Sequence, residues 1–129
     1  MSGYTAARSA YTQSSVLTAS PEQLVVMLYD GAIRFIRQAG AGLGDGRRDL
    51  ARERLRRAEA IIDELNDSLD MSQGELPERL RSIYLFCRRH LRESLLADDP
   101  HGFETVAGLL GELRESWANL ANAAAAATE

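Results

Sequence analysis

Apolar side chains recur every three or four residues in four separate stretches of this 129-residue chain. This spacing places them on one face of an α-helix, and the strict alternation typical of a β-strand is not seen in any stretch. Between residues 51 and 69 the recurring side chains are Ala51, Leu55, Ala58, Ile62, Leu65 and Leu69. Four helices of about 20 residues joined by short turns bury such stripes most simply against one another. We therefore predict an all-α fold, an antiparallel up-and-down four-helix bundle.

The first helix is predicted to begin at Pro21. Ser20 is suited to accept a hydrogen bond from the Gln23 amide, and the Gln23 side chain can reach back to the Ser20 amide, which together form a capping box. The helix is predicted to end at Gly40, because glycines at positions 40, 42, 44 and 46 favour a helix end and a flexible turn. These glycines are not followed by the Gly-Lys-Ser/Thr of a phosphate-binding loop, so we exclude nucleotide binding there.

The other three helices also have recognisable ends. We expect the second helix to stop near Asp70 and the third to begin around Pro77. The fourth should follow directly, with Asp99 as its N-cap and Pro100 as its first residue. Its apolar stripe consists of Phe103, Val106, Leu110, Leu113, Trp117 and Leu120.

The ends of the chain differ in composition from its middle. We expect residues 1–19 to form a flexible N-terminal arm, residues 20–122 the bundle, and residues 123–129 a fraying alanine-rich tail. Residues 1–15 lack the apolar core of a secretory signal. The longest apolar run, residues 24–29, is much shorter than the roughly 20 residues that span a bilayer. We therefore expect no membrane insertion and a cytoplasmic location.

Charge and residue usage argue against several classes of protein. The formal net charge of −4 and the pI near 5.2 argue against a nucleic-acid partner. The single cysteine, Cys87, excludes an internal disulfide, and its place among apolar residues predicts a buried thiol. His90 and His101 do not form the paired Glu-x-x-His motifs of a di-metal bundle. We therefore expect no metal, no cofactor and no enzymatic activity.

Six arginines lie between residues 47 and 57, interrupted by Asp49 and Glu53. The first interpretation is a solvated helix face, on which Glu53 and Arg57 form an ion pair one turn apart. The alternative is a contact for an acidic segment of a partner protein.

The first helix carries more apolar surface than a bundle helix needs. Ten of the thirteen residues from 24 to 36 are apolar or aromatic. A normal core stripe accounts for about half of them, and a second strip lies beside it on the helical wheel. The strip consists of Val26, Tyr29, Ile33 and Ile36. It is either a wide core contact, a homodimer interface, or a groove for an apolar segment of another chain.

Two adjacent blocks, residues 16–24 (VLTASPEQL) and residues 27–35 (MLYDGAIRF), resemble the bacterial flagellar export chaperone FliS. Weaker similarity covers about residues 11–120. The resemblance implies an antiparallel helical bundle without enzymatic activity. It also implies binding of the disordered C-terminal segment of flagellin, which keeps flagellin from polymerising prematurely in the cytoplasm and aids its delivery to the type III export apparatus. Components of the export gate are further candidate partners.

The resemblance and the wide apolar strip together nominate a partner-binding surface. Gly31 is expected to allow close approach of the partner's backbone, and Tyr84 lies in a matching region. In the family the N-terminal arm can lie over this surface when flagellin is absent. The resemblance implies this role for Tyr4, Tyr11, Val16 and Leu17. The expected binding residues are Tyr11, Val16, Leu17, Val26, Tyr29, Gly31, Ile33, Ile36 and Tyr84. The alternative function is a homo-oligomeric structural bundle, and we expect a monomer or a weak homodimer.

Overall fold

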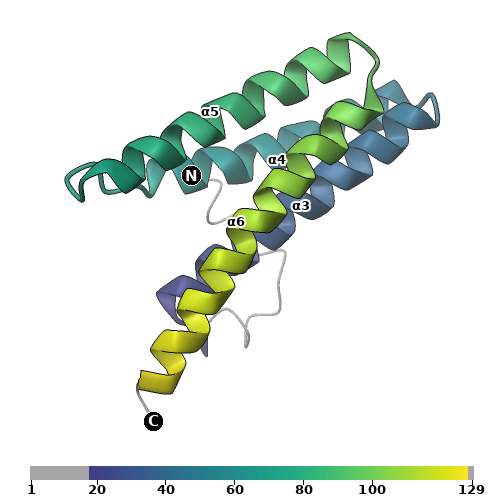
Figure 1. Cartoon of the computed structure of the whole chain (residues 1–129). Helices are drawn as coiled ribbons and strands as arrows, with labels where there is room; N and C mark the ends of the chain where they lie inside the picture. Colours follow the sequence, from purple (N-terminus) through teal and green to yellow (C-terminus); the bar gives the residue numbers. More distant parts are fainter. Residues whose placement is uncertain (1–17, 128–129) are drawn as a thin grey trace.

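The computed structural model describes residues 18–127, and four α-helices contain nearly all of them (Figure 1). The helices are α3 (Pro21–Gly44), α4 (Arg48–Asp67), α5 (Glu75–Leu96) and α6 (Pro100–Ala127). Consecutive helices run in opposite directions, and no strand occurs within residues 18–127. The predicted all-α four-helix bundle is therefore confirmed.

Helix α3 occupies a central position, because it packs along α4 on one side and along α6 on the other. Helix α5 completes the bundle by packing on α4 and α6. Figure 1 shows that α5 and α6 meet at the turn that joins them and then diverge, so that the C-terminal half of α6 lies beyond α5. This divergence leaves one side of α6 without a neighbouring helix.

The core lies where the predicted apolar stripes meet. The α4 side chains Ala51, Leu55, Ala58, Ile62 and Leu65 are all buried, and Cys87 of α5 lies in the same core. Their burial confirms the stripe of the second helix as far as Leu65, and the predicted position of the thiol. Leu69, the last member of the predicted stripe, lies past the end of α4 and is half-buried.

The start of α3 has the predicted capping box. The Ser20 hydroxyl oxygen accepts a hydrogen bond from the Gln23 amide at 3.2 Å, and Gln23 Oε1 accepts one from the Ser20 amide at 2.7 Å. Pro21 follows as the first helical residue, where its missing N–H costs no helical hydrogen bond. The box satisfies amide groups that would otherwise lack partners at the helix start.

The end of α3 differs from the prediction, because the helix continues past Gly40 to Gly44. Gly40 and Gly42 are buried within it. A Cβ on Gly40 would lie 2.9 Å from Cβ of Phe103 on α6, and one on Gly42 would lie 3.3 Å from Leu50 Cδ2 on α4. These glycines therefore allow two helices to approach α3 closely. The turn itself falls at Gly46, whose φ is +76°.

The remaining boundaries lie close to their predicted places. Helix α4 ends at Asp67, α5 begins at Glu75, and α6 begins at Pro100 after Asp99, whose side chain accepts a hydrogen bond from the His101 amide at 3.1 Å. Helix α6 continues through the alanine run to Ala127, past residue 122. The predicted N-terminal arm, apart from residues 18 and 19, lies outside the described residues.

Candidate partner-binding surface

The residues nominated for partner binding lie in three kinds of environment. Val26 and Ile33 are half-buried on α3. Tyr11, Val16 and Leu17 lie outside the described residues, as does Tyr4. The buried members of the set are Tyr29, Gly31, Ile36 and Tyr84.

The second apolar strip of α3 is largely core. Tyr29 and Ile36 are 0% exposed, so neither side chain lies at the surface. The reason is the central place of α3: a helix that packs against two neighbours needs a wider apolar face than a helix at the edge of a bundle. Of the three interpretations of this strip, the wide core contact holds at these two positions.

Tyr29 and Tyr84 join α3 to α5 through a buried hydrogen bond. Their hydroxyl oxygens are 2.6 Å apart, and their ring centroids are separated by 6.4 Å. Burial raises the pKa of both hydroxyls, and for Tyr29 the neighbouring Tyr84 and Trp117 side chains partly oppose this rise. Both side chains are therefore neutral and fixed in position beneath the surface.

The outer face of α3 retains a smaller apolar strip, which consists of the half-buried side chains Val26 and Ile33 and which we call the outer strip. A shallow depression of about 540 Å³ is lined there by residues of α3, with Ile33 as its main apolar side chain. Ion pairs to α6 flank Ile33. Asp30 binds Arg114 at 2.8 and 3.4 Å, which raises the pKa of that guanidinium, and Arg37 lies 3.3 Å from Glu104. Around Ile33, the outer strip is therefore bordered by charged side chains of both signs.

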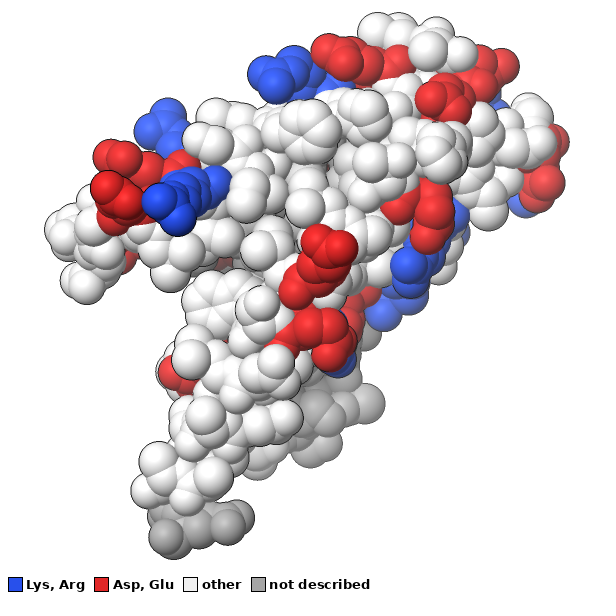
Figure 2. Space-filling model, viewed as in Figure 1, with Lys and Arg blue, Asp and Glu red and all other residues white. Residues whose placement is uncertain are grey.

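The apolar stripe of α6 extends beyond the helices that cover it. Val106 and Leu110 are fully buried, Leu113 and Trp117 are half-buried, and Leu120 is 53% exposed. Helical spacing keeps these side chains on one face, so the exposure rises along a single continuous stripe. Figure 2 shows that the molecule is hollowed between α5 and the C-terminal half of α6, where the surface is largely uncharged. We call Leu113, Trp117 and Leu120 the open stripe.

The sequence reasoning placed the open stripe in the core and did not consider it for binding. Its spacing was visible in the sequence, but its exposure depends on the divergence of α5 from α6. The same reasoning also missed three exposed apolar side chains of α5, Leu85, Phe86 and Leu96. Phe86 stacks on His90 with ring centroids 5.3 Å apart, which covers part of its ring.

Ion pairs join several of the charged side chains of the bundle. Arg57 lies 2.5 Å from Glu53, which confirms the predicted pair on α4.

Burial raises the pKa of the Cys87 thiol to about 11, so the thiol stays protonated at neutral pH. Within residues 18–127, His, Cys, Asp and Glu side chains form no cluster that could hold a metal ion. None of the described helices is long and apolar enough to cross a membrane.

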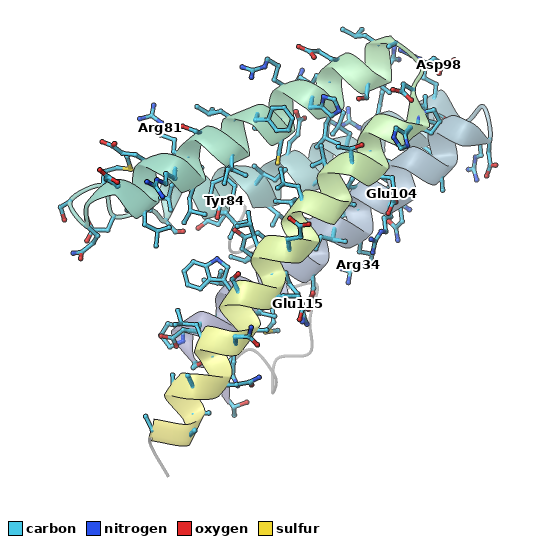
Figure 3. All side chains as sticks on the ribbon, viewed as in Figure 1. Arg34, Arg81, Tyr84, Asp98, Glu104 and Glu115 are labelled. Atoms are coloured by element: carbon cyan, nitrogen blue, oxygen red, sulfur yellow. The ribbon has the colours of Figure 1, made fainter. Side chains whose placement is uncertain are left out.

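Figure 3 shows Tyr84 on the side of α5 that faces α6. It shows Glu115 on the C-terminal half of α6, where this helix has diverged from α5. Tyr84, hydrogen-bonded to Tyr29, is buried beneath the α5 side of the hollow, and the open stripe continues the face of α6 that packs on the core. Such an arrangement can bind an apolar helical segment by burying side chains on both of its walls.

Comparison with known proteins gives a consistent result. Residues 4–124 match the family model described as flagellar protein FliS. The chain is 36% identical over 118 residues to the flagellar secretion chaperone FliS of Salmonella typhimurium, covering 90% of this chain and 87% of that protein. It is 33% identical over 109 residues to the protein of the same name from Bacillus subtilis, covering 84% and 81%. The Escherichia coli protein is 32% identical over 107 residues, covering 81% and 79%.

Proposed function

Because the chain belongs to the FliS family of flagellar secretion chaperones, we propose that it binds the disordered C-terminal segment of flagellin in the cytoplasm. Bound in this way, flagellin cannot polymerise before export, and the complex can be delivered to the flagellar type III export apparatus and its gate components. The role is binding and release, without a catalytic step.

The open stripe is the observation that carries this proposal. Burying a large apolar side chain is worth about 1.5–3 kcal/mol, so Leu113, Trp117 and Leu120 together leave a substantial gain to a partner. A helix of the client placed in the hollow would cover all three. Leu120 is the most exposed of them.

The outer strip of α3 is the second contact that we propose for the client. Val26 and Ile33 lie two helical turns apart and are half-buried, so a client segment can cover both. Tyr29, Ile36 and Tyr84 support these contacts from beneath, and Gly31 is buried on the same helix. Ordering a disordered client costs about 2–5 kcal/mol, which favours two separated contacts over one.

Titration calorimetry with a peptide of the flagellin C-terminal segment tests the proposal. We expect Leu120→Asp and Ile33→Asp each to weaken binding by about tenfold or more, because each puts a charge into an apolar contact. Leu85→Asp is the matched control, since Leu85 is similarly exposed but belongs to neither of the two proposed contacts, and the variant should bind as the wild type does. Wild-type affinity in both folded variants would refute the assignment of the surface.

The homo-oligomeric alternative predicts a different result from the same proteins. If the open stripe were a dimer interface, light scattering would show a dimer that dissociates in Leu120→Asp, and the flagellin peptide would not bind the wild type. We expect instead that the wild type binds the peptide and that its mass does not depend on Leu120.

The N-terminal arm is proposed to cover the client surface in the absence of flagellin, through Tyr11, Val16 and Leu17. Deleting residues 1–17 should then increase the binding of an apolar dye to the chaperone. The increase should disappear when flagellin peptide is added. If the deletion leaves dye binding unchanged, the arm does not cover an apolar surface.

A further inference from the structure

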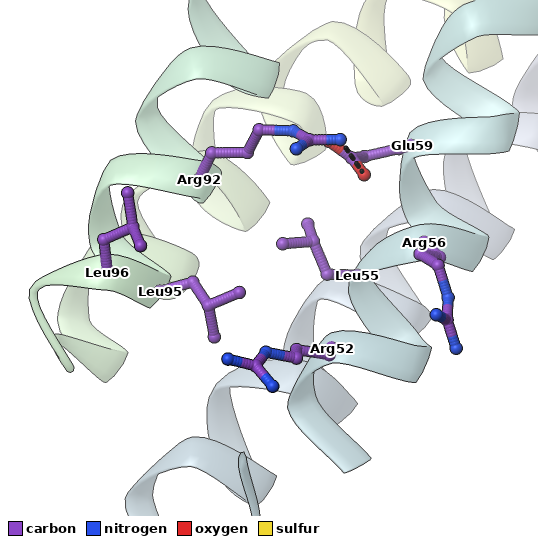
Figure 4. A pocket seen from close by; sticks show the side chains of 7 residues that line it. All are labelled: Arg52, Leu55, Arg56, Glu59, Arg92, Leu95 and Leu96. Atoms are coloured by element: carbon purple, nitrogen blue, oxygen red, sulfur yellow. Dashed lines mark hydrogen bonds and ion pairs between the residues drawn. The ribbon is translucent and has the colours of Figure 1, made fainter. Parts of the chain in front are cut away.

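A cavity of about 330 Å³ lies between α4 and α5, near the end of α5 that leads into α6 (Figure 4). Leu55 is buried at its base, Leu95 is half-buried beside it, and Leu96 at its edge is 80% exposed. Leu96 is the most exposed of the large apolar side chains that the structure describes. The cavity shares no residue with the open stripe or with the outer strip of α3.

Among the described residues that line this cavity, Glu59 is the only carboxylate, and its charge is already neutralised. Glu59 is 6% exposed, and its two oxygens accept hydrogen bonds from Arg92 at 2.7 and 3.1 Å. Arg88 lies 3.7 Å from the same carboxylate and binds Asp63 at 2.8 Å. The acidic group of the cavity is therefore fully used within the protein.

The arginines on the α4 side of the cavity are not paired in this way. Arg52 and Arg56 make no ion pair or hydrogen bond with any residue in the described part of the chain. Figure 4 shows the Arg52 guanidinium extending toward Leu95 across the mouth of the cavity, whereas Arg56 points away along α4. The cavity thus combines an apolar base with an uncompensated positive charge at its mouth, in a protein whose net charge is −4.

We propose that this cavity is a second docking site, which takes a short amphipathic segment of another protein carrying an acidic side chain next to an apolar one. The apolar side chain would enter between Leu55 and Leu95 and cover Leu96. The carboxylate would accept hydrogen bonds from the Arg52 guanidinium, whose planar donors match a carboxylate well. The arginine-rich segment, residues 47–57, would then make a contact with a partner in addition to forming a solvated helix face.

The chemistry favours an acidic protein segment over RNA. The residues that line the cavity include no aromatic ring on which a base could stack. Nucleic-acid binding also relies on many phosphate contacts, whereas here a single unpaired guanidinium reaches over an apolar base. The site does not depend on the proposed flagellin contact, and we expect the two partners to bind together.

Fluorescence anisotropy tests the second site on the full-length protein with labelled helical peptides that carry leucine and glutamate on one face. Three peptides that differ in the order of these residues serve as probes, beside versions with glutamine in place of glutamate. We expect saturable binding of at least one glutamate peptide, weakened by about tenfold in its glutamine version and in Arg52→Glu, and weakened also in Leu96→Asp. Arg81→Glu is the control, since Arg81 also lacks a partner in the described chain but lies on α5 about 16 Å before Arg92.

Any of the following outcomes would overturn the proposal. No saturable binding by any of the three peptides, equal binding of the glutamine versions, or equal loss in Arg81→Glu would show that the cavity has no such preference. Stronger binding of an RNA oligonucleotide that is lost in Arg52→Glu would assign the site to a different partner. Displacement of the probe by saturating flagellin peptide would make the cavity part of the client site.

The readouts keep this inference separate from the proposed function. Arg52→Glu should bind flagellin peptide as the wild type does, and Leu120→Asp should bind the acidic probe as the wild type does. If flagellin peptide fails to bind the wild type while the acidic probe binds, the proposed function fails and the second site stands.

Discussion

The hydroxyl oxygens of Tyr29 and Tyr84 are 2.6 Å apart within the core, although the two residues are 55 positions apart in the chain. This contact joins the central helix α3 to the N-terminal half of α5. Because both groups are buried, each satisfies a hydrogen-bonding requirement that water cannot meet.

Replacing either tyrosine by phenylalanine should destabilise the bundle. Tyr84→Phe and Tyr29→Phe should each lower the free energy of unfolding by about 1–3 kcal/mol, because each leaves the other hydroxyl buried with fewer partners. The double variant should lose less than the two single losses combined, since it removes both polar groups. Urea unfolding followed by circular dichroism measures all four proteins. Strictly additive losses would contradict the coupling of the two hydroxyls.

The stability of the protein should fall in alkaline solution. Burial raises the pKa of Cys87 from 9.0 to about 11 and also raises the pKa of both tyrosines. The neutral forms are thus favoured in the folded state, and the unfolded chain loses these protons first. The contribution of Cys87 is complete below pH 9 and falls by about 1.4 kcal/mol per pH unit from pH 9 to about 11, whereas the contribution of the tyrosines begins to fall only above pH 10.

The effect of the thiol on stability can be distinguished from that of the tyrosines by the pH at which each effect begins. Between pH 9 and 10 the decline should come from Cys87, and the tyrosines should add to it above pH 10. Urea unfolding of Cys87→Ala should therefore show little slope in the lower interval, whatever its absolute stability. An unchanged slope there would show that Cys87 is not the group responsible.

The bundle could be predicted from the sequence because its dominant signal is local. The spacing of Ala51, Leu55 and Ala58 on α4 places them on one face, and burial of that face follows in any bundle. The capping box at Ser20 is local as well, since all its atoms belong to residues 20–23. Features of this kind do not depend on how the helices are arranged.

The binding surface could not be predicted in the same way, because it depends on that arrangement. A helical wheel shows that Tyr29 and Ile36 are apolar, but it does not show that α3 lies between two other helices and buries them. The stripe of α6 is likewise visible in the sequence, whereas the exposure of Leu120 results from the divergence of α5. The early end predicted for α3 at Gly40 failed because Phe103 packs there from a distant part of the chain.

The ion pairs of Glu59 should matter more than those at the surface. Glu59→Gln removes the charge that Arg92 and Arg88 share, and it should lower the free energy of unfolding by about 1–3 kcal/mol. Glu75→Gln breaks the exposed pair with Arg79, 3.2 Å long, and should leave the stability unchanged within error. Thermal unfolding at low and high salt compares them. Equal effects of the two substitutions would mean that burial does not strengthen the Glu59 pairs.

Gly102 of α6 and Gly40 of α3 should respond to alanine in the opposite way from Gly108 of α6. A Cβ on Gly102 would lie 1.8 Å from Ser94 Oγ and 2.6 Å from Ser94 Cβ, and one on Gly40 would lie 2.9 Å from Phe103 Cβ. Gly102→Ala and Gly40→Ala should therefore each lower the free energy of unfolding by about 1–3 kcal/mol through overpacking. Urea unfolding provides the measurement.

Gly108 provides the matched control on the same helix, because a Cβ there would meet no other group within 4 Å. Gly108→Ala should raise the free energy of unfolding by about 0.5–1 kcal/mol, the gain expected when alanine replaces glycine inside a helix. Adding Ser94→Gly to Gly102→Ala removes both clashing atoms, so it should recover part of the lost stability despite the glycine that it places in α5. If Gly102→Ala were as stabilising as Gly108→Ala, the close packing of α6 against α5 at Ser94 would be wrong.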